Sequence, residues 1–237
     1  MTNLKNLDIV YLVKNSKYNG ELRHSLRSVC QNFPHRNIWF VGGMPERIKP
    51  DYYIPVRQPE SNTKYENFLL LIDAIINSKG ISSSFVLFND DFFVLNKVKQ
   101  LPVYINGTIP ELIEFVKRES VKPNSNYIKI LNHHIIELKN RKLPINNFAL
   151  HVPMVLNKTL IKNVIEEFGT FGRSLYGNYV YYTDYCEQMK DVKIMNHIQI
   201  PTENQIYVST SDGSFNLGEV GKYIRNKFNE PCKYEYE

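Results

Sequence analysis

The sequence predicts an α/β fold with an open, mostly parallel sheet and helices on both faces. Three observations support this prediction. The chain has 237 residues, 43% of them hydrophobic, which is enough for a sizeable core. Short apolar runs of strand length alternate with segments whose apolar residues recur every three or four positions. The first half reads strand, helix, strand, helix, strand, and such sheets bind ligands beyond the carboxyl ends of their strands.

Each element of the first half has its own signal. Residues 7–13 form an apolar run of strand length, and residues 21–32 follow as a helix with Leu22, Leu26 and Val29 on one face and Pro34 beyond its end. The remaining elements are a strand at 37–41 closed by a Gly-Gly turn, a helix at 64–77 and a strand at 85–88.

The second half alternates less regularly. Its apolar spacing predicts helices at 110–119, 158–168 and 217–228, while residues 127–131 and 194–200 are typical of strands. No repeat and no linker rich in proline, glycine or serine interrupts the chain. We therefore expect a single domain over residues 1–237.

Composition and missing motifs exclude several classes of protein. The first residues do not resemble a secretory signal and no run is long enough to span a membrane, so a cytoplasmic location is expected. Cys30, Cys186 and Cys232 are too widely spaced to indicate a disulfide framework or a zinc site. The Gly-rich dinucleotide motif, the Walker A motif and the serine-hydrolase elbow are absent. A net charge of +5 favours an anionic partner without naming it.

Asn89, Asp90 and Asp91 follow directly after the apolar strand at 85–88, and apolar residues resume after them. Adjacent carboxylates beside a buried strand repel each other and lose hydration, which a bound cation would relieve. Their oxygen ligands suit magnesium, manganese or calcium. The alternative is a polar turn between two strands, because asparagine and aspartate favour turns.

Two helices carry candidate ligands for a phosphate. Arg23 and Arg27 lie one turn apart on the first helix, and Lys64 and Asn67 lie three residues apart on the second. Solvated surface side chains are the alternative in both cases. The pair at 133–134, two histidines, is not expected to hold one ion, because neighbouring side chains on a strand point to opposite faces.

Several segments together resemble the Stealth family of capsular-polysaccharide phosphotransferases. The second conserved region of that family resembles Glu-Leu-Arg-His-Ser-Leu-Arg-Ser at 21–28, Ile-Trp-Phe-Val at 38–41 and Phe-Val-Leu-Phe-Asn-Asp-Asp-Phe-Phe at 85–93. Leu-His-Val-Pro-Met at 150–154 is similar to the third region, and residues 171–182 are similar to the fourth. The same plan, with 209–212 and 220–225, also resembles small phage-encoded glycosyltransferases.

The first region of Stealth proteins contains a tryptophan followed by acidic residues, whereas this chain has Asp-Ile-Val-Tyr-Leu-Val-Lys-Asn at 8–15. Those acidic residues belong to the active site of the family. Their absence favours glycosyl transfer over transfer of a sugar phosphate. The resemblance implies a GT-A-like architecture, with residues 1–100 binding a nucleotide sugar and residues 101–237 facing the acceptor.

The resemblance also implies roles for individual residues. Asp91 is expected to bind a divalent metal, Mn²⁺ or Mg²⁺, with Asp90 as second ligand or as acceptor for a sugar hydroxyl. His151 is a candidate base and Arg173 a candidate phosphate ligand. The residues expected to bind the donor are Tyr11, Val13, Lys14, Arg23, Arg27, Lys64, Asn67 and Asn89. Late in the chain, His197 and Asp212 are candidates for the acceptor side or for a further metal ligand.

The sequence therefore predicts a metal-dependent glycosyltransferase that uses a nucleoside diphosphate sugar. The alternatives are a Stealth-type sugar-phosphate transferase and a non-catalytic protein that binds carbohydrate or nucleic acid. A virion protein, a cell-surface glycan, teichoic acid or modified DNA would each fit as acceptor, and a phage-encoded enzyme would act in the host cytoplasm.

Overall fold

The computed structural model describes residues 3–119, 126–181 and 183–236 and divides into two compact units. The first unit comprises Met1–Leu101, His151–Lys158 and Val192–Glu237, and the second comprises Pro102–Leu150 and Thr159–Asp191. The last 46 residues of the chain, 192–237, thus belong with the first hundred rather than with the second unit. No helix in the described part of the chain is long and apolar enough to cross a bilayer.

The first unit contains the main sheet, whose strand order is β3-β2-β1-β4-β7. Its strands are β1 (Asp8–Val13), β2 (Ile38–Gly42), β3 (Tyr52–Pro55), β4 (Ser84–Asn89) and β7 (Met154–Asn157). The first four are parallel, and β7 pairs antiparallel with β4. The prediction of an α/β fold with a mostly parallel sheet is confirmed, although the edge strands β3 and β7 were not expected.

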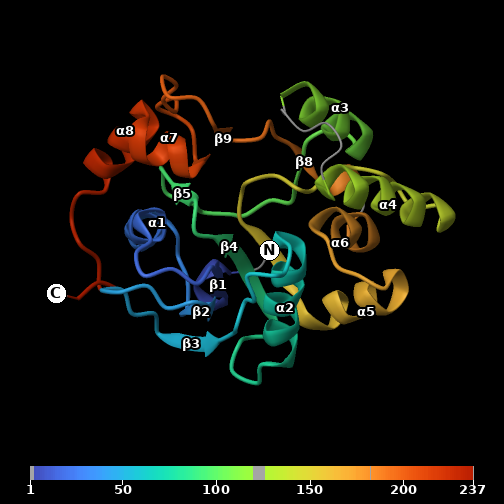
Figure 1. Ribbon diagram of the computed structural model, residues 1–237, viewed down its shortest axis with the longest axis horizontal. Coiled ribbons are helices and arrows are strands. Elements are labelled where there is room, and N and C mark those ends of the chain that lie inside the picture. The colour runs from blue at the N-terminus through green and yellow to red at the C-terminus, as the bar shows by residue number, and fades with distance from the viewer. Residues whose placement is uncertain (1–2, 120–125, 182, 237) are drawn as a thin grey trace. The chain divides into compact units, whose positions relative to one another are not determined.

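Helices α1 (Gly20–Asn32) and α2 (Lys64–Asn77) connect the parallel strands and lie on different sides of β1 and β4 (Figure 1). Both begin with a side-chain cap. Asn19 Oδ1 accepts a hydrogen bond from the Leu22 amide, and Thr63 and Glu66 form a capping box. The bounds of α2 match the predicted helix, and those of α1 differ by one residue.

The direction of chain progression reverses beside β1. From β1 the chain moves outward through α1 to β2 and then to β3, and α2 returns it to β4 on the other side of β1. Leu12 at the end of β1 pairs with Asn89 at the end of β4. Open α/β sheets bind ligands at the carboxyl ends of two such strands. The topology therefore places a ligand crevice next to Asn89.

A second, smaller sheet of the first unit has the order β5-β10-β9. It consists of β5 (Phe92–Val94), β10 (Tyr207–Thr210) and β9 (Lys193–Ile194), with β5 antiparallel and β9 parallel to β10. A 3-10 helix, η1 (Leu4–Asn6), precedes β1. Because β4 and β5 belong to different sheets, the turn at Asp90 and Asp91 carries the chain from one sheet to the other.

Two short helices, α7 (Asp212–Leu217) and α8 (Glu219–Lys227), pack beside the small sheet around Phe93, Phe215 and Phe228. One helix at 217–228 was expected, but the chain breaks at Gly218, where the backbone is extended. The predicted strand at 194–200 was also wrong beyond Ile194. Residues 195–200 are exposed and contain no strand, so their apolar side chains do not join the core.

The second unit is mainly helical, with α3 (Ile109–Glu119), α4 (Asn126–Asn140), α6 (Arg173–Val180) and most of α5 (Lys158–Phe168). It also holds η2 (Thr183–Tyr185) and the parallel pair β6 (Tyr104–Ile105) and β8 (Glu187–Gln188). The helix predicted at 158–168 is confirmed, and α3 begins one residue before the predicted start. The strand predicted at 127–131 was wrong, because Ile128, Leu131 and Leu138 form the buried face of α4.

Candidate functional site

A cavity of about 660 Å³ lies at the carboxyl ends of β1 and β4, within the first unit. Its volume falls within the range of about 300–1,000 Å³ that is usual for small-molecule sites. Seven of the residues expected from the sequence line this one cavity: Lys14, Lys64, Asn67, Asn89, Asp90, Asp91 and Asp212. They come from β4, α2, α7 and the turns that follow β1 and β4. The topology thus brings together residues that lie almost 200 positions apart in the sequence.

Asp91 is held by the small sheet. Its Oδ2 accepts hydrogen bonds from Lys193 Nζ at 2.9 Å and from Ser209 Oγ at 3.0 Å. Lys193 and Ser209 pair with each other across β9 and β10, which aims both donors at the turn. The other oxygen, Oδ1, is buried and has no hydrogen-bond partner among the described residues. A buried carboxylate oxygen without a partner is costly, so this atom is suited to an additional positively charged ligand.

Asp90 is supported by the residue that caps α1. Asn19 Nδ2 donates to Asp90 Oδ2 at 2.6 Å, while the Asn19 carbonyl oxygen caps the helix. Burial raises the pKa of Asp90, the hydrogen bond from Asn19 opposes that rise, and the neighbouring charge of Asp91 adds to it. The net pKa is raised. The Asp90 side of the turn therefore disfavours a full negative charge.

Glu21 is a third acidic group of the cavity that the sequence did not single out. It lies in the first turn of α1, only 9% of its surface is exposed, and its Oε1 accepts a hydrogen bond from Thr210 Oγ1 at 2.5 Å. Burial, followed by the charges of Asp91 and Asp90, raises the pKa of Glu21 to about 7 against the hydrogen bond from Thr210. Its position within the run 21–28 of the Stealth-like segment was the one signal that could have identified it.

The charged residues that line the cavity are three lysines and four carboxyl groups: Lys14, Lys64, Lys193, Glu21, Asp90, Asp91 and Asp212. Lys14 and Asp212 are exposed and lie 3.8 Å apart, a long ion pair that adds little stability. Lys193 is the lysine that hydrogen-bonds a carboxylate of the turn, and sequence reasoning gave no signal for it. The carboxyl groups outnumber the lysines, so an anionic ligand would need further positive charge here.

Four of the expected donor-binding residues lie elsewhere. Tyr11 and Val13 are fully buried in the core, and the hydroxyl groups of Tyr11 and Ser25 are hydrogen-bonded at 2.8 Å. The reason is strand alternation, which turns Leu12 and Lys14, not Tyr11 and Val13, toward the cavity.

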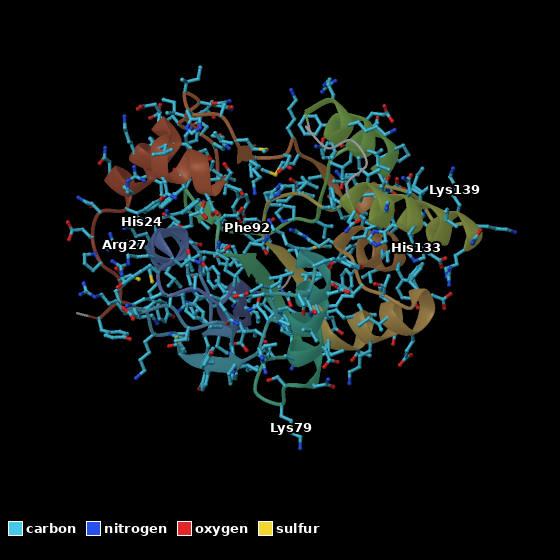
Figure 2. The ribbon with its side chains drawn as sticks, viewed as in Figure 1. His24, Arg27, Lys79, Phe92, His133 and Lys139 are labelled. Carbon is cyan, nitrogen blue, oxygen red and sulfur yellow. The ribbon has the colours of Figure 1, made fainter. Side chains whose placement is uncertain are left out.

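Arg27 projects from α1 beside His24 (Figure 2) and binds Glu235 through two hydrogen bonds of 2.6 and 2.7 Å. Arg23 lies 3.6 Å from the same carboxylate. The two arginines hold the C-terminal segment to α1 and do not line the cavity.

The remaining candidates are also dispersed. His151 is half-buried with its ring edge-on to the ring of Phe92, at a centroid distance of 6.4 Å. His197 is exposed on the connection between β9 and β10. Arg173 belongs to the second unit, where its Nη1 donates to the Leu150 carbonyl at 2.6 Å and burial lowers its pKa to about 10. Tyr182, at the end of the run similar to the fourth Stealth region, lies outside the described residues.

The two adjacent histidines lie on α4 (Figure 2 labels His133), not on a strand as the sequence suggested. His134 is buried, and burial followed by the charge of His133 lowers its pKa to about 4. Its ring packs so closely against Gly172 that a Cβ atom there would lie 2.6 Å from Cε1. The pair is therefore part of the packing between α4 and the start of α6.

The cavity residues fit a hard divalent cation as a partial site. No group of three or more His, Cys, Asp or Glu side chains in the described ranges is arranged to hold a metal ion. Mg²⁺, however, is commonly bound by one or two carboxylates together with substrate phosphates and water. Asp90 and Asp91 would supply oxygen ligands, and Asp91 Oδ1 is a buried atom that a cation would satisfy.

Comparison with protein-family models and with curated proteins gives no match, so the resemblance to Stealth proteins stays an expectation. Two solved structures of the glycosyltransferase GlyE from Streptococcus pneumoniae TIGR4 align with this chain. The apo form aligns with 9% identity and a TM-score of 0.44, and the second structure with 10% identity and a TM-score of 0.43. Each alignment covers 95% of this chain but only 60% and 61% of the GlyE chain. This chain therefore spans about three fifths of the length of GlyE.

Proposed function

We propose that this protein is a metal-dependent glycosyltransferase that uses a nucleoside diphosphate sugar. The observation that carries the proposal is the pair Asp90 and Asp91 in a cavity at the carboxyl ends of β1 and β4, with three lysines lining the same cavity. Cavities at this point of an open α/β sheet typically bind nucleotides. Carboxylates mixed with lysines suit a ligand that brings both phosphate charge and a counter-cation.

The lysines would bind the diphosphate. Lys14 and Lys64 are exposed and line the cavity, from the end of β1 and the start of α2, and neither has a short hydrogen bond to a carboxylate within the described part of the chain. Lys193 is directed into the turn by Asp91. Preorganised positive charge stabilises a departing diphosphate more than it stabilises the bound donor, because negative charge accumulates on the leaving oxygen as the glycosidic bond breaks.

Asp90 and Asp91 would hold the divalent cation, Mn²⁺ or Mg²⁺. When bound, such an ion supplies Lewis-acid stabilisation of the leaving diphosphate, a contribution of several kcal/mol. Asn19, Ser209 and Lys193 keep the two carboxylates in place by hydrogen bonds to one oxygen of each. Asp91 Oδ1, which has no hydrogen-bond partner in the described part of the chain, would then be available as a ligand.

The decisive test incubates the purified protein with a panel of nucleotide sugars, with and without Mn²⁺ and Mg²⁺, and identifies the released nucleotide. Metal-dependent release of a nucleoside diphosphate is the expected result. Release of a monophosphate would instead identify a sugar-phosphate transferase. If no donor is cleaved but some donors raise the melting temperature, the protein is a binding protein and the transferase proposal is wrong.

The variant Asp91→Asn tests the metal-binding pair. Asparagine keeps the size of the side chain but removes the charge at Oδ1, so we expect metal-dependent turnover to fall at least about 100-fold, the scale of removing one electrostatic contact to a transition state. The measurement is the initial rate of nucleotide release at saturating metal. Asp73→Asn, an exposed aspartate of α2, is the matched control and should keep full activity. Equal rates for the Asp91→Asn variant and the wild type would refute the assignment.

A further inference from the structure

The first unit has a second cavity, of about 540 Å³, between α1 and the segment that follows α8. Its lining includes Cys30 and Arg27 of α1 and Cys232 and Lys233 near the C-terminus. Among the described residues, none that lines this cavity also lines the one at Asp90 and Asp91. It is therefore a separate feature of the molecule, and the proposed glycosyl transfer makes no use of it.

The two thiols in this cavity are direct neighbours. Cys30 and Cys232 line the same cavity, both are half-buried and free, and the largest influence on the pKa of each thiol is the other thiol. Nothing in the sequence indicated a disulfide, because the cysteines are widely spaced and Cys30 and Cys232 lie about 200 residues apart. The fold brings them together, while the third cysteine, Cys186, belongs to the second unit.

The cavity also favours thiol chemistry at one of the two sulfurs. The neighbouring Cys30 thiol, opposed by burial and assisted by the Tyr234 amide and the charge of Arg27, lowers the pKa of Cys232. The same thiol contact and burial raise the pKa of Cys30. A thiolate beside cations is the reactive form of cysteine, so Cys232 is the nucleophile of the pair and Cys30 is the resolving thiol.

We propose that Cys30 and Cys232 are a redox modification site that forms an intramolecular disulfide with a small-molecule disulfide as oxidant. The Cys232 thiolate attacks one sulfur of the oxidant, displacing a thiolate and leaving a mixed disulfide. The Cys30 sulfur then attacks Cys232 Sγ and displaces the second small thiol, while the Cys30 proton passes to the first leaving thiolate. Two protein thiols are oxidised and one disulfide is reduced to two thiols.

The bridge would join α1 to a segment that is already docked on it. Arg27 Nη1 donates to the carbonyls of Phe228 and Asn229, and Arg27 also binds the carboxylate of Glu235. After Cys232 in the sequence, the Tyr234 carbonyl accepts a hydrogen bond from the Lys49 amide at 2.8 Å. These contacts bracket Cys232 in the sequence and hold its segment in place beside α1. Oxidation would make this docking covalent.

The test treats the native protein with glutathione disulfide, alkylates the remaining thiols and measures the intact mass and the tryptic peptides. We expect a single alkylated cysteine, Cys186, and a peptide pair joined through Cys30 and Cys232, both reversed by dithiothreitol. The Cys186→Ser variant should form the same bridge. The Cys30→Ser variant should instead retain glutathione on Cys232, because no resolving thiol remains.

Three outcomes would overturn the proposal. One is glutathione retained on both Cys30 and Cys232 in the wild type, and another is full alkylation of all three cysteines after treatment. The third is a bridge that forms only between two molecules, seen as a dimer on non-reducing electrophoresis. Circular dichroism of each serine variant before oxidation ensures that the comparison is made on folded protein.

Discussion

Buried acidic groups near the two ends of β1 differ in their hydrogen bonding and in the direction of their pKa shifts. At its start, Asp8 is fully buried, and its two oxygens accept four hydrogen bonds. Arg36 donates two at 2.9 and 2.7 Å, and Asn37 and the Ser82 amide donate one each at 3.0 Å. Burial would raise the pKa of Asp8, but these hydrogen bonds outweigh it and the net pKa is lowered.

Beyond the other end of β1, the cavity leaves its acidic groups incompletely paired. Asp91 Oδ1 has no hydrogen-bond partner in the described part of the chain, and the pKa values of Asp90 and Glu21 are raised. The hydrogen bonds of Asp8 thus come from the protein itself. The carboxyl groups near the other end of β1, those of Glu21, Asp90 and Asp91, are less completely hydrogen-bonded. The first arrangement stabilises the fold, and the second is suited to binding.

The largest expected effect on stability is at Asp8. The variant Asp8→Asn removes the charge from four hydrogen bonds and turns an amide donor toward other donors, so we expect the free energy of unfolding to fall by about 2–3 kcal/mol. Urea denaturation at pH 7 measures this change. The exposed control Asp73→Asn should stay within about 0.5 kcal/mol of the wild type. If Asp8→Asn loses no more stability than Asp73→Asn, the hydrogen bonds of Asp8 do not stabilise the fold, and the contrast with the cavity end of β1 fails.

Glu21 gives the next largest effect, and it depends on pH. The pKa of this group is about 7 in the folded protein against a reference of 4.5, so between these values the unfolded chain releases a proton that the folded protein keeps. The free energy of unfolding that Glu21 contributes therefore falls as pH rises through this window. Relative to the wild type, Glu21→Gln should gain about 1–3 kcal/mol between pH 4 and pH 8.

Urea denaturation of both proteins across that pH range measures the difference, in which the other titrating groups largely cancel. The pH dependence has the opposite sign to that expected for Asp8. The pKa of Asp8 is lowered, so Asp8 stabilises the fold above its reference pKa of 3.8, and this stabilisation is lost as the pH falls. A difference between wild type and Glu21→Gln that does not change with pH would mean that Glu21 ionises normally.

The smallest effect is expected at the rim of the cavity. Lys14 and Asp212 are 62% and 77% exposed and lie 3.8 Å apart, so water screens their attraction. Asp212→Asn should change the free energy of unfolding by less than about 1 kcal/mol. Thermal unfolding at low and high salt checks this, and a larger, salt-sensitive loss would show that the rim is structurally coupled to the cavity interior.

Local patterns in the sequence predicted much of the fold. The helices at 64–77 and 158–168 match α2 and α5 because their apolar spacing and terminal residues are local properties. Residues 127–131 were misassigned because the short run Tyr-Ile-Lys-Ile-Leu is rich in β-branched and aromatic residues, as a strand is. Only the continuation through Leu131 to Leu138 shows the helical face. The edge strands β3 and β7 depend on partners that lie far away in the sequence.

The candidate site was predictable where one short segment contained it. Asn89, Asp90 and Asp91 stand together after a strand, and the expected topology placed them at the ligand-binding edge. Lys193 and Ser209 were not predictable, because their role arises from pairing between β9 and β10 and from contact with Asp91. Arg27 was misjudged for the same reason, since its partner, Glu235, comes from the far end of the chain.

The passage of the chain between two sheets at Asp90 and Asp91 has a mechanical consequence. On one side β4 is fixed between β1 and β7, and on the other β5 is fixed by pairing of Phe92 with Ser209. Phe92 and Phe93 are both buried, on opposite faces of β5, so adding or deleting one residue in this turn would exchange their faces and disturb the packing on both sides of the strand. The spacing of the acidic pair is therefore locked by the packing of the aromatic residues that follow it.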